Sequence, residues 1–124
     1  MGLRLLAVDD DRDSVDLIRT ILINAGAEVR VSVSAAEALK IVRDWRPDVL
    51  ISDIEMPGED GYELIRKVRS LDAESGGRLP AVALTAYGRA EDRHRSTSAG
   101  FNMHVPKPVD PAELVTIVSN LAGR

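Results

Sequence analysis

Acidic side chains gather at two points in the sequence, each directly after a short apolar segment. Asp9, Asp10 and Asp11 follow the first such segment, and Asp53 follows another after a single serine. Carboxylates that share a small volume repel one another, so they are tolerated when a cation is bound or when some protons are retained. Mg²⁺ suits such a cluster because it prefers oxygen ligands and commonly combines one or two protein carboxylates with phosphate oxygens. The acids therefore indicate a Mg²⁺ site that handles phosphate.

A hydroxyl and an ammonium group follow two later apolar segments, at Thr85 and Lys107. The chemistry that fits is attack by a carboxylate on a phosphoryl donor, which gives an aspartyl phosphate. A phosphoryl group in transfer carries charge on three oxygens, and Mg²⁺, Lys107 and the Thr85 hydroxyl with nearby backbone N–H groups could each neutralise one. Singly, each residue is ordinary, since acids often cap helices, as we expect for Asp11. Their joint occurrence after four apolar segments favours a site.

Alternating strands and helices must position these groups. The apolar segments read as buried strands at Leu3–Val8, Ala27–Val33, Val49–Ile51, Ala81–Leu84 and Met103–Val105. Helical spacing of apolar residues between and after them predicts helices around 15–22, 38–42, 64–68 and 114–121. Residues 89–99 are polar, so a fourth helix there, ended by Gly100, is predicted from its position alone.

Helix starts are also marked. Ser34 with Glu37 and Asp110 with Glu113 have capping-box spacing, and Pro111 suits a first helical position. Strict strand–helix alternation implies right-handed crossovers and a parallel sheet covered on both faces, a three-layer α/β fold. Ligands in such folds bind beyond the carboxyl ends of the strands, where the acids, the threonine and the lysine lie.

Composition limits the alternatives. The chain has 124 residues, enough for one domain, which we place at residues 1–124, although the chain could come from a longer protein. A net charge of −4 with dispersed basic residues argues against direct nucleic-acid binding. The absence of cysteine excludes thiol chemistry and fits a cytoplasmic location, and no apolar run is long enough to span a membrane or form a signal-peptide core.

The motifs taken together resemble the receiver domain of bacterial response regulators over residues 3–122. The resemblance is carried by Val8-Asp9-Asp10, by Ser52-Asp53-Ile54-Glu55-Met56-Pro57 with Asp60-Gly61, by Leu84-Thr85-Ala86 and by Lys107-Pro108. It implies a doubly wound, flavodoxin-like sheet of five parallel strands in the order 2-1-3-4-5.

For the site, the resemblance implies that Asp53 is the phosphoacceptor. Asp9 and Asp10 would form an acidic pocket, with Asp10, Asp53 and the backbone carbonyl of Glu55 as Mg²⁺ ligands and Mn²⁺ able to substitute. Thr85 and Lys107 would bind the phosphoryl group, and the Lys107–Pro108 peptide would be cis.

Further roles are implied around this centre. Thr85 would move toward the phosphate and His104, where the family has an aromatic residue, would follow it, which changes the face made by the fourth helix, fifth strand and fifth helix. Glu55 and Tyr87 would tune the phosphoryl lifetime. Gly61 suits a backbone conformation closed to β-branched residues.

The sequence at residues 84–87 and 100–109 is similar to that of receivers attached to hybrid histidine kinases. The resemblance thus implies a histidine kinase or a histidine phosphotransfer domain as partner, with kinase domains in the same chain as one arrangement. Such a domain catalyses its own phosphorylation and dephosphorylation without being a turnover enzyme. Two rivals remain: a haloacid-dehalogenase-like phosphatase fragment, for which the chain is short, and a pseudo-receiver that only binds partners.

Overall fold

Five strands and five α-helices alternate along the chain in a computed structural model that describes residues 2–56, 58–85 and 90–123. The elements are β1 (Arg4–Val8), α1 (Arg12–Asn24), β2 (Glu28–Ser32), α2 (Ala35–Trp45), β3 (Val49–Asp53), α3 (Gly61–Arg69), the 3₁₀ turn η1 (Ala73–Ser75), β4 (Ala81–Thr85), α4 (Ala90–Ala99), β5 (Met103–Pro106) and α5 (Pro111–Leu121). All strand pairs are parallel, in the order β2-β1-β3-β4-β5. The predicted fold class and strand order are confirmed.

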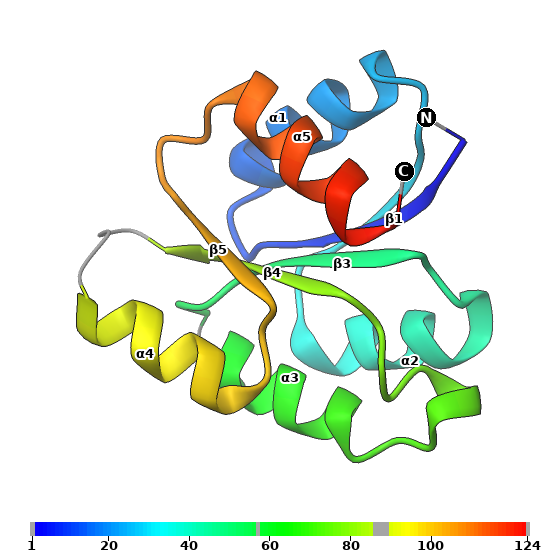
Figure 1. Ribbon diagram of the computed structural model, residues 1–124, viewed down its shortest axis with the longest axis vertical. Coiled ribbons are helices and arrows are strands. Elements are labelled where there is room, and N and C mark those ends of the chain that lie inside the picture. Colours follow the sequence, from blue (N-terminus) through cyan, green and yellow to red (C-terminus); the bar gives the residue numbers. More distant parts are fainter. Residues whose placement is uncertain (1, 57, 86–89, 124) are drawn as a thin grey trace.

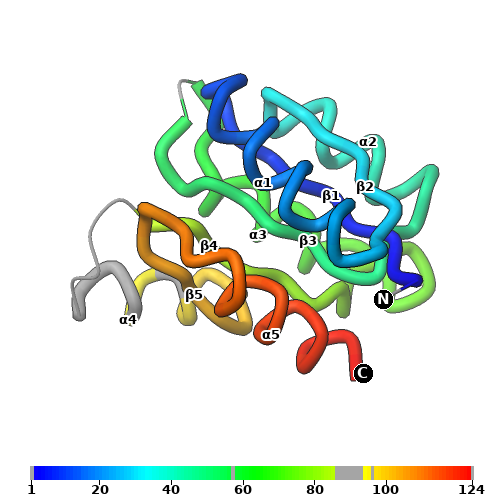
Figure 2. The backbone as a smooth tube through the Cα atoms, turned by 90° about the horizontal axis from the view of Figure 1, so that it is seen from above, coloured from blue at the N-terminus to red at the C-terminus, as the bar shows by residue number. Residues whose placement is uncertain are grey.

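Helices cover both faces of the sheet, with α1 and α5 on one side and α2, α3 and α4 on the other (Figure 1). In the view from above, α1 lies nearer β1 and α5 nearer β5 (Figure 2). Side chains along a strand point alternately to the two faces, so β3 contributes Val49 and Ile51 to the core under α1 and α5, and Leu50 to the opposite core. A sheet buried on both faces explains why β3 and β4 are apolar almost throughout.

Side-chain caps fix where the helices begin. Asp11 accepts a hydrogen bond from the Asp13 N–H at 3.0 Å, and Ser34 accepts one from the Glu37 N–H at 3.3 Å. Asp110 caps α5 in the same way, with Pro111 in the first turn. These caps were expected from the sequence, and the assignment of Asp11 as a cap is confirmed. Asp60, which caps α3, was not recognised as a cap.

The polar helix α4 spans Ala90–Ala99, within the range predicted from its position. Gly100 follows its last residue, and the φ of 127° at this glycine lies in a region that favours glycine. The guanidinium of Arg69, at the end of α3, donates hydrogen bonds to the carbonyl oxygens of Gly100 and Leu79 and to Oδ1 of Asn102. Burial lowers the pKa of Arg69. This network ties the connection between α4 and β5 to α3 and to the loop before β4.

The chain's single tryptophan lies at the other end of the sheet from the acidic residues. Trp45 ends α2, is 8% exposed, and lies within 5.4 Å of the Arg4 guanidinium and 4.6 Å of the Arg30 guanidinium, measured to the ring centroid. The ring therefore covers the end of α2. Among the helices of the described ranges, none combines the length and the apolar character needed to cross a membrane.

Candidate functional site

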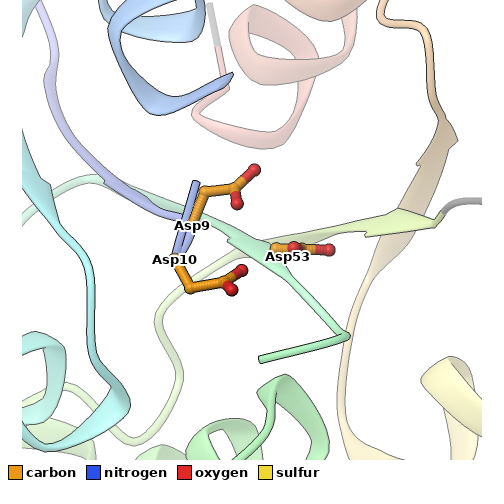
Figure 3. Close-up of side chains that lie close together, drawn as sticks. All are labelled: Asp9, Asp10 and Asp53. Atoms are coloured by element: carbon orange, nitrogen blue, oxygen red, sulfur yellow. The ribbon is translucent and has the colours of Figure 1, made fainter. Parts of the chain in front are cut away.

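Three carboxylates meet at the carboxyl ends of two adjacent strands. Asp9 and Asp10 follow β1, and Asp53 ends β3; one carboxylate oxygen from each lies within 4.8 Å of the others. Figure 3 shows the three side chains extending to the same side of the chain. Asp9 and Asp53 are buried, whereas Asp10 is exposed. The strand order explains the meeting, because β1 and β3 pair directly although Asp9 and Asp53 are 44 positions apart in the sequence.

The ammonium of Lys107 reaches the same place from the end of β5. Its Nζ lies 3.1 Å from Oδ2 of Asp9 and 3.2 Å from Oδ2 of Asp53. The backbone helps to hold it there, since the Lys107 N–H donates to the Thr85 carbonyl at 2.7 Å. The Lys107–Pro108 peptide bond is cis, as the resemblance implies. One cation therefore bridges two buried anions.

The pKa values of Asp53 and Lys107 are both shifted from those of exposed side chains. Burial raises the pKa of Asp53 to about 6, although the charge of Lys107 acts in the opposite direction, and the neighbouring Asp9 adds to the rise. For Lys107, burial lowers the pKa, but the hydrogen bond to Asp9 and the charge of Asp53 outweigh it and leave the pKa raised. With three carboxylates and one ammonium, the site attracts a further cation at neutral pH.

The donor set fits Mg²⁺. Oδ2 of Asp9 accepts a hydrogen bond from Lys107, and Oδ1 accepts one from the Asp11 N–H at 3.0 Å. Because both oxygens of Asp9 already have partners, Asp10 and Asp53 offer the freer oxygen atoms. A hard divalent cation held by oxygen ligands is the expected occupant of such a cluster.

Thr85, at the end of β4, has a buried hydroxyl group. Its side chain is 4% exposed, and within the described residues its buried Oγ1 has no hydrogen-bond partner. Buried hydroxyl groups normally have partners, because leaving one unsatisfied costs about 1–3 kcal/mol. Thr85 lies at the same edge of the sheet as Asp53, which pairs in register with Leu84, the residue before Thr85.

The start of α3 packs closely against the backbone at the end of β3. A Cβ on Gly61 would lie 2.3 Å from the Asp53 carbonyl oxygen and 2.8 Å from Cα of Ile54. The expectation that Gly61 serves a special backbone conformation is wrong, because Gly61 is not among the glycines with positive φ. Its role is close approach: no side chain fits between the helix and the end of β3.

The remaining residues named from the sequence lie around this centre. Glu55 has an exposed side chain beyond the end of β3. His104 is half-buried on β5, in register with Ala83, and does not belong to the acidic cluster. Tyr87 and Ala86 lie outside the described residues. Ser52, quoted in a motif but given no role, is fully buried and donates a hydrogen bond to the Asp53 carbonyl.

The raised pKa of Asp53 predicts that the metal-free protein becomes more stable when this charge is removed. A carboxyl with pKa about 6 when folded and 3.8 otherwise favours the folded state below about pH 4, and this contribution is lost as pH rises through 6. At pH 7.5 without divalent cations, we expect Asp53→Asn to increase the free energy of unfolding by about 1–3 kcal/mol. Because Asp53→Asn also removes the ion pair between Asp53 and Lys107, we expect a gain near the lower end of this range.

Urea denaturation with a chelator at pH 7.5 and at pH 5 measures this effect. The difference between variant and wild type should shrink at pH 5, and Mg²⁺ should stabilise the wild type more. A variant that is less stable than the wild type at pH 7.5 without metal would contradict the assignment of the raised pKa.

Comparison with known proteins agrees with the geometry. The chain matches the response regulator receiver domain over residues 5–119. It is 49% identical over 114 residues to an uncharacterized 14.6 kDa protein in the sodA1 3′ region of Leptolyngbya boryana, covering 92% of this chain and 86% of that protein. The chain spans 52–58% of the length of other curated relatives, which include response regulators.

Solved structures are similar along the whole chain. A putative response regulator from Chloroflexus aurantiacus superimposes with a TM-score of 0.93 at 38% identity, and all of both chains is covered. The receiver domain of the sensor histidine kinase PA1611 from Pseudomonas aeruginosa, with a magnesium ion coordinated in its active site cleft, gives a TM-score of 0.90 at 31% identity, again covering both chains fully. The chain belongs to the response regulator receiver domain family of two-component systems.

Proposed function

We propose that this chain is a phosphoacceptor switch in which Asp53 receives a phosphoryl group in a Mg²⁺-dependent reaction. The observation that carries the proposal is the convergence of the Asp9, Asp10 and Asp53 carboxylates with the Lys107 ammonium at one edge of the sheet. Membership of the receiver family supports it, because receivers act in two-component signalling. Phosphatase chemistry of the haloacid-dehalogenase type gains no support from these findings.

Asp10, Asp53 and the backbone carbonyl of Glu55 would hold the ion, with Asp9 completing the acidic pocket. Support comes from the carboxylate spacing in this chain and from the magnesium ion in the cleft of the PA1611 receiver. When bound, Mg²⁺ supplies neutralisation of charge on a phosphoryl oxygen, and Mn²⁺ is an acceptable substitute.

The protein's own groups perform the transfer. A carboxylate oxygen of Asp53 attacks phosphorus, a new O–P bond forms, and the bond from phosphorus to the donor's leaving group breaks. Lys107, already 3.2 Å from Asp53, remains beside the transferred group and stabilises its negative charge. The buried Thr85 hydroxyl gains the partner that it otherwise lacks within the described residues.

The switch would act through Thr85. Movement of this residue toward the phosphate would draw His104 on the neighbouring strand and change the face formed by α4, β5 and α5. Thr85 pairs in register with Pro106, and His104 lies two residues before Pro106 on β5. This proximity supports a direct coupling between the movements of Thr85 and His104. Glu55 and Tyr87 would tune the phosphoryl lifetime; Tyr87 lies outside the described residues.

The donor would be a phosphohistidine of a histidine kinase or of a histidine phosphotransfer domain. The names of similar structures support this, since the PA1611 receiver belongs to a sensor histidine kinase. A groove beside Lys107 is lined by apolar groups, among them Leu17, which is 58% exposed, and Pro108. Because Lys107 borders both this groove and the acidic cluster, the groove offers apolar surface to a protein donor beside the site.

We further propose that residues 1–124 form one receiver domain that works in the cytoplasm and binds no nucleic acid directly, with kinase domains in a longer native chain as one arrangement. The absence of cysteine and the net charge of −4 support this setting.

Incubation with Mg²⁺ and acetyl phosphate tests the function, with intact mass as the readout. We expect the wild type to gain a single phosphate and Asp53→Asn to gain none. A chelator should prevent the modification of the wild type. Modification of Asp53→Asn, or an unmodified wild type that still binds histidine kinases, would overturn the proposal, and the second result would identify a pseudo-receiver.

A further inference from the structure

Ser52 places a hydroxyl group in β3 directly after the apolar residues Val49–Ile51. It is fully buried in β3, in register with Val8 on one side and Ala83 on the other. An apolar residue would fit this environment without the cost of removing a hydroxyl from water. The hydroxyl instead donates a hydrogen bond of 2.9 Å to the carbonyl oxygen of Asp53, the next residue.

This hydrogen bond is part of a frame around the residues that lead out of the strand. The Ile54 N–H donates to the Leu84 carbonyl at 3.3 Å, and the Ile54 carbonyl accepts from the Gly61 N–H at 2.9 Å. The Cα of Gly61 packs so closely on the Asp53 carbonyl that a Cβ would lie 2.3 Å from it. The peptide groups on either side of Ile54 are thereby held by hydrogen bonds to β4 and to the start of α3, and the next carbonyl along the chain is that of Glu55.

We infer that Ser52 is a positioning residue for the divalent cation: its hydroxyl fixes the Asp53–Ile54 peptide and so sets the orientation of the Asp53 carboxylate and the Glu55 carbonyl. The inference rests on the proposed Mg²⁺ site. Without the hydroxyl, the Asp53 carbonyl loses the hydrogen bond from Ser52, and the peptide group can rotate toward another donor. Residues that orient metal ligands typically change metal affinity by about 10–100-fold when removed.

Ser32 provides a matched control within the same sheet. It is also a buried serine at the end of a strand, 2% exposed, and its hydroxyl donates to a nearby backbone carbonyl, that of Ser34, at 2.9 Å. That hydrogen bond serves the start of α2 and touches no proposed ligand. Ser32→Ala therefore reports the general effect of losing a buried serine hydroxyl.

The test is calorimetric titration of the full chain with MgCl₂, alongside urea denaturation in a chelator. We expect Ser52→Ala to raise the dissociation constant for Mg²⁺ about tenfold. Ser32→Ala should leave the constant within twofold of the wild type, while both variants lose similar stability without metal. Ser52→Thr, which keeps the donor, should restore affinity. If Ser52→Ala does not fold, Ser52→Cys, with a weak donor of similar size, takes its place.

The outcomes separate this inference from the proposed function. Wild-type affinity in Ser52→Ala, or an equal loss of affinity in Ser32→Ala, would overturn the positioning role and leave the Mg²⁺ site intact. A wild type that binds no Mg²⁺ would overturn both. A loss of stability in Ser52→Ala with unchanged affinity would identify the hydroxyl as purely structural.

Discussion

We expect Lys107→Met to slow phosphorylation of Asp53 about a hundredfold at saturating Mg²⁺, because one positioned charge donor typically contributes about 10²–10³ to such a rate. Lys107 is the described cation that lies within 3.2 Å of both buried carboxylates, Asp9 and Asp53. Methionine keeps the length and apolar stem of the side chain and removes only the charge. The measurement is the rate of mass increase with acetyl phosphate.

The same substitution should destabilise the metal-free protein by about 2–3 kcal/mol, since it leaves two buried carboxylates without their cation. Lys67→Met is the matched control: this lysine also pairs with a carboxylate, that of Glu59, but its side chain is 55% exposed. Exposed pairs contribute about 0–1 kcal/mol, so both rate and stability should change little. A Lys107→Met protein that is phosphorylated at the wild-type rate would remove the ammonium from the mechanism.

Gly61→Ala should cost about 3 kcal/mol of folding free energy, a large effect for a single methyl group. The atoms that the new Cβ would meet are backbone atoms of Asp53 and Ile54, which cannot swing aside as a flexible side chain could. Either α3 moves away from the sheet or the end of β3 shifts. Denaturation midpoints in urea, with a chelator present, give the size of the change.

Gly58→Ala separates this crowding from backbone strain. Gly58 has a φ of 76°, but no atom of the described residues beyond its chain neighbours lies within 4 Å of the position of an added Cβ, so among these residues only the left-handed conformation opposes alanine. That penalty is about 1–2 kcal/mol. If Gly61→Ala were no more destabilising than Gly58→Ala, the close contact between α3 and β3 would not be a constraint on the sequence.

The architecture was predictable because burial leaves a strong pattern. The strands β1, β3 and β4 are short and mostly apolar, and Val15, Ile18 and Leu22 on α1 repeat at helical spacing and are buried. Helix α4 lacks such a pattern, so only alternation and the Gly100 stop signal predicted it. The chain compensates partly through Arg69, whose hydrogen bonds hold the α4–β5 connection, an interaction between distant residues that leaves no local signal.

The site was predictable as far as side-chain type at strand ends could indicate it. Asp9, Asp10, Asp53 and Lys107 converge as expected, because parallel order brings strand ends to one edge. The close approach of Gly61 and the backbone hydrogen bond of Ser52 depend on exact packing, which residue type does not encode. The one available signal was a serine within the apolar run of β3, and it was read only as part of a motif.

The position of Trp45 has a practical consequence for these measurements. The guanidinium groups of Arg4 and Arg30 both lie over the indole ring, and Arg4 opens the strand whose opposite end leads to Asp9. Its fluorescence should therefore respond when the sheet and α2 separate and stay nearly constant when an ion or a phosphate enters the pocket. We therefore expect the fluorescence of Trp45 to report unfolding without a contribution from bound ligand. Stability comparisons between metal-free and metal-bound protein can then use it without an added label.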